Sequence, residues 1–254
     1  MIANYHTHTT RCRHAKGNDR EYVEAAIERG LKILGFADHT PFPLPGYGTG
    51  MYPEDLEDYT NAILALKNEY KNEIDIYLGL EVENAPDQFE ALQSLLKNYP
   101  LEYLILGQHA VFGFDDYKVA FKPTDRVEVF EAYCNQCVQA MESGLFTYWA
   151  HPDVIYFEGN TLLYEKRMRE LCIIAKQWGL PLEINMNGIS YQRNYPNPVF
   201  WKIAGEENCP VIIGIDAHKP EHIRNLDAAY ASAMNLVQTY HLKLQETVTL
   251  KKPF

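Results

Sequence analysis

Residues 1–8 read MIANYHTH, a short apolar run that leads directly into the triplet His6-Thr7-His8. The apolar run has the length and composition of a strand that is buried on both faces of a parallel sheet. Alternate residues of an extended segment point to the same side, so His6 and His8 can bind one ion together. A buried strand that ends in metal-ligand residues is the pattern that decides the fold, because it recurs along the chain.

Short apolar runs alternate with amphipathic helical patterns over most of the chain. The predicted strands are residues 1–5, 32–37, 75–80, 103–108, 147–150, 182–185 and 211–215. Between them, apolar residues at helical spacing predict helices that begin near Tyr22, Pro53, Phe89, Val127, Tyr164, Pro198 and Leu226. This alternation predicts a parallel sheet with right-handed crossovers, either doubly wound or closed into a barrel. No repeat or long linker interrupts the pattern, so we expect one domain over residues 1–254.

Composition excludes several classes of protein. The 254 residues include 34 acidic and 23 basic side chains, and the net charge of −11 is unsuited to non-specific binding of nucleic acid. No apolar run approaches the roughly 18 residues that span a bilayer, and the first residues lack the pattern of a signal peptide. The 5 cysteines are few and odd in number, which favours a reducing, cytoplasmic location. The oligomeric state is left open.

Metal-ligand residues follow six of the seven predicted strands. They are His6, His8, Asp38, His39, Glu81, His109, His151, Asp216 and His218, and His14 lies in the loop after the first strand. In parallel α/β barrels the carboxyl ends of the strands build the active site. Seven of the 9 histidines fall there, whereas His222 and His241 are expected at the surface.

The number of ligands indicates more than one ion. A single histidine at a strand end is usually a hydrogen-bonded structural residue, but independent core histidines would not all follow successive strands. Neutral imidazole and carboxylate suit zinc, iron or manganese. Seven imidazoles and at least two carboxylates are too many for one ion, so we expect two or three ions that share a carboxylate.

The strand-end residues resemble, in order and spacing, the motifs of the PHP (polymerase and histidinol phosphatase) superfamily. The motifs are His6-Thr7-His8-Thr9, His14-Ala15, Phe36-Ala37-Asp38-His39, Gly79-Leu80-Glu81, Gly107-Gln108-His109, Ala150-His151-Pro152-Asp153 and Gly214-Ile215-Asp216-Ala217-His218. They lie within residues 1–225, and residues 11–17, 40–43 and 216–221 look like the branch of PHP-type histidinol-phosphatases. The resemblance implies the α/β fold class, as a distorted (β/α)7 TIM-like barrel (the PHP fold).

The resemblance also implies a centre of three divalent metal ions. Carried over by position, the first ion would be held by His6, His8, Glu81 and Asp216. The second would be held by His14, His39 and His218. The third would be held by Glu81, His109 and His151, with Glu81 as the bridge.

Such a centre implies a metal-dependent phosphatase, and the similar branch implies hydrolysis of L-histidinol phosphate in histidine biosynthesis. Clustered divalent ions lower the pKa of water and neutralise phosphoryl oxygens, so we expect a metal-bridging hydroxide to attack phosphorus. Asp38 and His218 are the candidates for donating a proton to the leaving oxygen, with bound water as the alternative. Asp38 has a second interpretation, which is that it orients a ligand histidine.

Substrate contacts are expected from residues near the strand ends. Arg193 follows the one predicted strand without a terminal ligand, and a guanidinium can bind phosphate through two N–H groups. Further basic candidates are Lys219, Arg11, Arg13 and Lys16. Glu83 either supports a ligand or, like Asp153, contacts the substrate amine. Phe42, Tyr47 and Tyr52 are candidates for a lid, and Cys12 packs near the ligands.

Other functions fit parts of the pattern. A PHP phosphoesterase of another specificity would act on phosphotyrosine, a sugar phosphate or a nucleotide. An amidohydrolase or deaminase barrel also has His-x-His after its first strand, but it uses one or two ions, and the early His14 and the Asp216-Ala217-His218 ending favour PHP. A metal-storage or regulatory module would show no turnover. In the leading interpretation the expected partner is a small phosphomonoester substrate, with no nucleic acid and no membrane.

Overall fold

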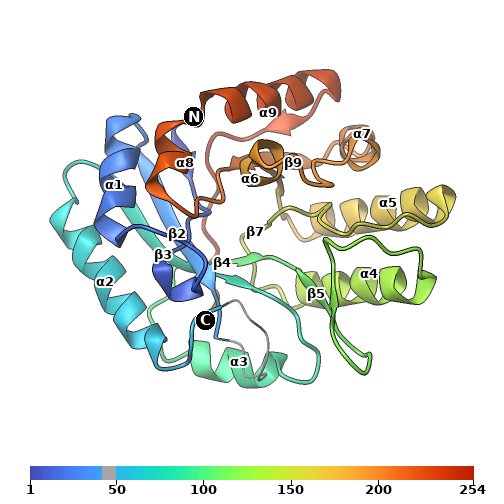
Figure 1. Cartoon of the computed structure of the whole chain (residues 1–254), viewed down its shortest axis with the longest axis horizontal. Helices are drawn as coiled ribbons and strands as arrows, with labels where there is room; N and C mark the ends of the chain where they lie inside the picture. The colour runs from blue at the N-terminus through green and yellow to red at the C-terminus, as the bar shows by residue number, and fades with distance from the viewer. Residues whose placement is uncertain (42–49) are drawn as a thin grey trace.

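Eight parallel strands form a curved sheet in the computed structural model, which describes residues 1–41 and 50–254 (Figure 1). In spatial order the strands are β1 (Ala3–Asn4), β2 (Ile33–His39), β3 (Asp75–Val82), β4 (Tyr103–Leu106), β7 (Tyr148–Trp149), β8 (Leu182–Asn185), β9 (Pro210–Gly214) and β10 (Lys243–Leu244). The prediction of an α/β fold with a parallel sheet is confirmed, and all seven predicted strands are present.

Backbone contacts beyond β1 and β9 close the sheet into a distorted TIM-like barrel. Thr7 and Ala217 form a parallel bridge, in which the His8 N–H donates to the Ala217 carbonyl at 2.9 Å. The Ala217 N–H donates in turn to the His6 carbonyl at 3.1 Å. The two segments that close the barrel are therefore the same two that carry the predicted ligand pairs, and the barrel interpretation is favoured over the open sheet.

One strand of the sheet was not predicted. β10 lies beside the first residues of β9, and the chain then continues across the barrel, where the Lys251 N–H donates to Thr147 Oγ1 at 3.0 Å. Val248 and Leu250 pack against the apolar cluster inside the barrel. A two-residue strand that contains a lysine has too little apolar pattern to be recognised from sequence.

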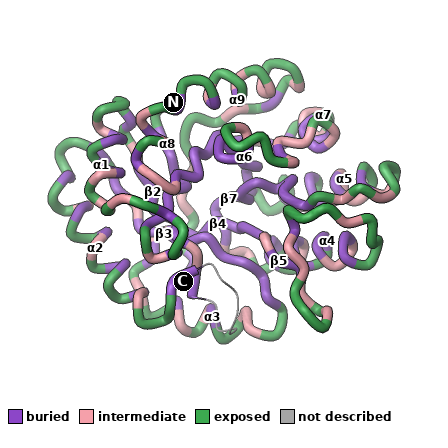
Figure 2. Tube along the Cα trace, viewed as in Figure 1, coloured by how far each residue is buried: buried purple, intermediate pink, exposed green. Residues whose placement is uncertain are grey.

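The longer helices surround the sheet and agree with the predicted helical patterns. They are α1 (Asp19–Glu28), α2 (Asp55–Glu69), α3 (Phe89–Leu96), α4 (Val127–Glu142), α5 (Thr161–Gln177), α7 (Pro198–Glu206) and α9 (Asp227–Thr239). Figure 2 shows burial concentrated in the strands and on the inward faces of these helices. No helix in the described parts of the chain is both long and apolar enough to cross a membrane.

Short elements at the carboxyl ends of the strands complete the fold. They are a 3₁₀ turn, η1 (Thr10–Cys12), two short helices, α6 (Met186–Ser190) and α8 (Pro220–Arg224), and a hairpin of β5 (Ala110–Val111) and β6 (Lys118–Val119). The sequence pattern did not predict them as elements. Together they place additional side chains around the predicted ligands.

Candidate metal centre

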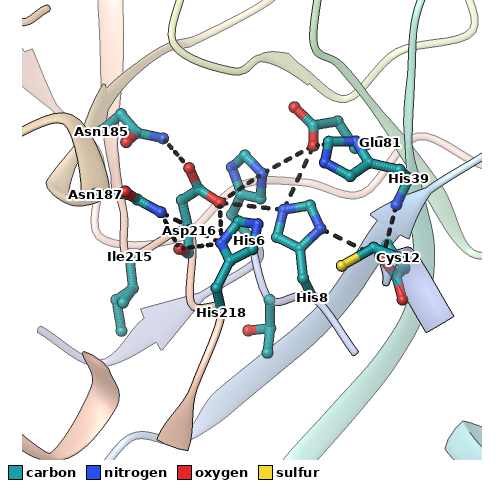
Figure 3. A network of polar contacts seen from close by, with 12 residues as sticks. His6, His8, Cys12, His39, Glu81, Asn185, Asn187, Ile215, Asp216 and His218 are labelled. Atoms are coloured by element: carbon teal, nitrogen blue, oxygen red, sulfur yellow. Dashed lines mark hydrogen bonds and ion pairs between the residues drawn. The ribbon is translucent and has the colours of Figure 1, made fainter. Parts of the chain in front are cut away.

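The predicted ligands converge at the carboxyl end of the barrel. The set is His6, His8, His14, His39, Glu81, His109, His151, Asp216 and His218, and ring or polar contacts join every member to another. Figure 3 shows several of these side chains facing one another, from the ends of β2 and β3 and from the segments that follow β1 and β9. The strand-end pattern therefore located one continuous cluster.

Four buried atoms at the base of this cluster have the spacing of ligands around an ion. His8 Nε2 lies 3.1 Å from Asp216 Oδ1 and 3.4 Å from Glu81 Oε2, and His6 Nε2 lies 3.3 Å from the same glutamate oxygen. Tetrahedral ligands of zinc are about 3.4 Å apart, given metal–ligand distances near 2.1 Å. All four atoms lack a hydrogen-bond partner among the described residues. A divalent cation would satisfy all of them, so the residues fit such an ion.

Glu81 connects two sides of the cluster through its two oxygens. Oε2 faces His6 and His8 and lies 3.1 Å from His39 Nδ1, whereas Oε1 lies 2.8 Å from His151 Nε2 and 3.6 Å from His109 Nε2. This is the arrangement expected of a bridging carboxylate. A Cβ at Gly107 would lie only 1.9 Å from Oε1, so a larger residue there would displace the Glu81 carboxylate.

The residues of the predicted second group, His14, His39 and His218, lie near one another and near Cys12 and His8. His14 Nε2 and His218 Nε2 lie 2.8 Å apart, and donor atoms of Cys12, His14 and His218 lie within 4.8 Å of one another. Those of His8, His39 and His218 form another group within the same limit. His218 therefore belongs to both groups, and the buried Cys12 thiol lies beside the ligands.

Two members of the cluster, Glu81 and His14, are held in the protonation states that bind metal. Burial alone would raise the carboxyl pKa of Glu81, but the nearby imidazoles of His39, His109 and His6 hold it well below its usual range. Burial lowers the pKa of His14 to about 4, with the neighbouring imidazoles of His218 and His8 adding to the effect. Ionised carboxylates and a neutral imidazole are the forms that bind metal.

The carboxylates of Asp38 and Glu83 contact the ring nitrogens of predicted ligands. The Asp38 carboxylate accepts the His39 N–H at 2.9 Å and lies 3.4 Å from His8 Nδ1. Glu83 accepts the Ala110 N–H at 2.9 Å and lies 3.3 Å from His109 Nδ1. Neither acid lines the cavity above the cluster. The geometry favours the positioning role for Asp38 over proton donation, and it does not support substrate contact by Glu83.

Glu183 is a functional candidate that sequence reasoning missed. It is fully buried in β8, where Oε1 lies 2.8 Å from His6 Nδ1 and Oε2 accepts the His151 N–H at 3.1 Å. A Cβ at Gly214 would lie 1.8 Å from its carboxylate. The available signal was an acid inside an apolar strand, on the same face as Asn185, whose amide donates to Glu183 at 3.0 Å.

Replacement of Glu183 by glutamine is expected to weaken metal binding about 10- to 100-fold, because the charged partner that orients His6 and raises its basicity is lost. Metal titration of the metal-free protein measures this change. Glu102→Gln is a matched control, since Glu102 pairs with Lys67 and accepts the Leu78 N–H outside the cluster. Unchanged metal affinity in the Glu183 variant would exclude the positioning role.

A cavity of about 420 Å³ opens above the ligands. Its walls include Tyr117, Phe121, Tyr191, Tyr195, Arg193 and His222. Arg193 Cζ lies 6.0 Å from the Phe121 ring centre and 5.9 Å from that of Tyr191. Among the described residues, no carboxylate forms an ion pair with Arg193. The cavity therefore combines a floor of metal ligands with a wall that carries a guanidinium.

Other predicted substrate contacts lie elsewhere. Lys219 lines an adjoining depression rather than this cavity, and Arg11 is paired with Asp19 and Asp58. Asp153 is buried and accepts hydrogen bonds from the Asn197 N–H and the Trp201 indole, so its predicted contact with an amine is not supported.

Two expectations about rings are refined by the structure. His222, expected at the surface, is half-buried and lines the open cavity. Tyr52 does not line the cavity but stacks on the Arg13 guanidinium, 3.9 Å from ring centre to Cζ. The other two lid candidates, Phe42 and Tyr47, lie outside the described residues.

Comparison with known proteins agrees with this architecture. The PHP domain model matches residues 4–187. A probable histidinol-phosphatase of Deinococcus radiodurans is 30% identical over 233 residues, covering 87% of this chain and 88% of the relative. The histidinol-phosphatase of Bacillus subtilis is 24% identical, covering 84% of this chain and 92% of the relative.

A solved structure shares the fold over nearly its whole length. It is the histidinol phosphate phosphatase of Lactococcus lactis in complex with Zn, L-histidinol and phosphate, with a TM-score of 0.77, 18% identity and 99% coverage of both chains. The fold, the matching model and the Deinococcus relative lead to one assignment: the chain belongs to the PHP domain family.

Proposed function

We propose that this chain is a metal-dependent phosphatase that hydrolyses L-histidinol phosphate to L-histidinol and phosphate, with residues 1–254 as one catalytic domain. The observation that carries the proposal is the set of buried ligand atoms around Glu81 that have no hydrogen-bond partner among the described residues, beneath an open cavity with Arg193 on its wall. The relative from Deinococcus radiodurans is named as a probable histidinol-phosphatase and that from Bacillus subtilis as a histidinol-phosphatase. The cytoplasmic location expected from the cysteine content is part of this proposal.

Three divalent ions of zinc, iron or manganese are proposed for the centre. His6, His8, Asp216 and one oxygen of Glu81 would hold the first ion. His109, His151 and the other Glu81 oxygen would hold another, and His14, His39 and His218 would supply the remaining ligands. When bound, these ions lower the pKa of water and neutralise phosphoryl oxygens, which is the chemistry of phosphomonoester hydrolysis.

The remaining residues act around this centre. Asp38, Glu83 and Glu183 hold the rings of His8, His109 and His6, so the ligand nitrogens stay directed at the ions. We assign His218 to metal binding rather than to proton donation, because its Nε2 lies against His14 Nε2. Arg193 is the proposed phosphate contact, since its guanidinium lines the same cavity.

Replacement of Arg193 by glutamine is expected to raise KM for histidinol phosphate about 10-fold or more, because a hydrogen-bonded guanidinium contact to an anion is lost. Steady-state kinetics measure the change. Arg126→Gln is the control, because Arg126 is exposed and pairs with Glu128 outside the cavity. An unaltered KM in the Arg193 variant would remove this residue from the binding site.

A panel of phosphomonoesters tests the proposed specificity. After reconstitution with zinc, iron or manganese, we expect histidinol phosphate to have the highest kcat/KM, above phosphotyrosine, sugar phosphates and nucleotides. A strong preference for another phosphomonoester would keep the phosphatase chemistry and overturn the substrate. Amide or deaminase turnover without phosphatase activity would instead support the amidohydrolase alternative.

A further inference from the structure

His222 forms hydrogen bonds to two neighbours, the His218 backbone and a side chain on the cavity wall. Its Nδ1 accepts the backbone N–H of His218 at 3.2 Å. A backbone N–H can only donate, so this ring nitrogen carries a lone pair and the proton of the neutral imidazole is on Nε2. The direction of the next hydrogen bond follows from this tautomer.

The next hydrogen bond reaches Tyr191. His222 Nε2 lies 3.0 Å from the Tyr191 hydroxyl, and the two ring planes meet at 63°. Because Nε2 carries the proton, it donates to the tyrosine oxygen, and the hydroxyl hydrogen of Tyr191 is left to donate elsewhere. Tyr191 lines the same cavity as Arg193, two residues further along the chain, with its ring beside the guanidinium.

We propose that Tyr191 donates a hydrogen bond to the phosphoryl group of the bound substrate and that His222 is the positioning residue that directs its hydroxyl. The inference rests on the proposed phosphatase function and adds a contact to it. Arg193 would supply charge to the phosphoryl oxygens, and Tyr191 a neutral donor from the same wall. His222 also connects this wall to the His218 backbone, so the donor is placed relative to the metal ligands.

Variants of both residues in the metal-loaded, full-length protein test the proposal. Tyr191→Phe removes only the hydroxyl, and we expect about 10-fold or more loss in affinity for inorganic phosphate and in kcat/KM for histidinol phosphate. Isothermal titration measures phosphate binding, and elemental analysis is expected to find unchanged metal content. Tyr156→Phe is the control, because Tyr156 is also exposed but does not line the cavity.

Two replacements of His222 separate its contact with the Tyr191 hydroxyl from its contact with the His218 backbone. Asparagine can still accept the His218 N–H but does not reach Tyr191, so we expect His222→Asn to lose phosphate affinity. Glutamine places an amide donor near the position of Nε2, so His222→Gln is expected to recover part of that loss. In the Tyr191→Phe background, His222→Asn is expected to add little, because both changes remove the same contact.

Three outcomes would overturn the inference: wild-type phosphate affinity in Tyr191→Phe, additive losses in the double variant, or equal losses in the two His222 variants. Failure of the proposed function is distinguishable, because the wild-type protein would then hydrolyse no phosphomonoester. Phosphate binding by Tyr191→Phe would still test the contact in that case.

Discussion

Replacement of Glu81 by glutamine is expected to reduce phosphatase activity at least about 1,000-fold, since it impairs electrostatic stabilisation on two sides of the centre at once. The amide has nearly the shape of the carboxylate but only one ligand oxygen. It cannot serve both the His6 and His8 side and the His109 and His151 side. Elemental analysis is expected to show a loss of bound metal together with the loss of rate.

The control for this variant is Glu102→Gln, which changes a carboxylate that lies outside the cluster. Circular dichroism of both variants checks that the fold persists. A Glu81→Gln protein with full metal content and wild-type turnover would show that Glu81 does not bridge.

Metal removal is expected to abolish activity and to lower the melting temperature by at least about 10 °C, which is the contribution of one ion present at about 1,000 times its dissociation constant. Without ions, the buried His6 Nε2, His8 Nε2, Glu81 Oε2 and Asp216 Oδ1 have no hydrogen-bond partners among the described residues. Calorimetry before and after chelation measures the change, and re-addition of metal is expected to restore both properties. An unchanged melting temperature and rate after complete chelation would contradict a metal centre.

Metal binding is expected to weaken as the pH is lowered. Burial opposes protonation of His6, but the carboxylates of Glu183, Asp216 and Glu81 outweigh it and raise its pKa to about 10 in the metal-free protein. At pH 7 the metal-free His6 is therefore protonated and must release its proton to bind an ion. Metal addition in weak buffer is expected to release protons, and metal affinity is expected to fall as the pH is lowered. Proton-neutral metal uptake would argue against His6 as a ligand.

The ligands were predictable because strand ends are visible in the sequence. Glu81 and Asp216 directly follow apolar runs, and parallel strands bring such residues to one end of a barrel. The barrel could also be anticipated, although its closure through Thr7 and Ala217 depends on backbone contacts that no residue pattern encodes.

The supporting residues were harder to predict. Glu83 lies two residues after Glu81 in the sequence, but only its contact with His109 distinguishes support of a ligand from contact with substrate. Glu183 follows no strand, since it lies inside one, and its partner His6 is far away in the sequence. His222 reaches the cavity because the short helix α8 turns back after His218, and the sequence pattern did not reveal that turn.

The most direct test of the account is a titration of the metal-free protein with zinc, iron or manganese while histidinol phosphate hydrolysis is followed. We predict that activity rises with added metal and reaches its plateau near three equivalents per chain, with phosphate released from histidinol phosphate. A plateau at one equivalent, or no hydrolysis of histidinol phosphate at any loading, would contradict the proposed trinuclear phosphatase.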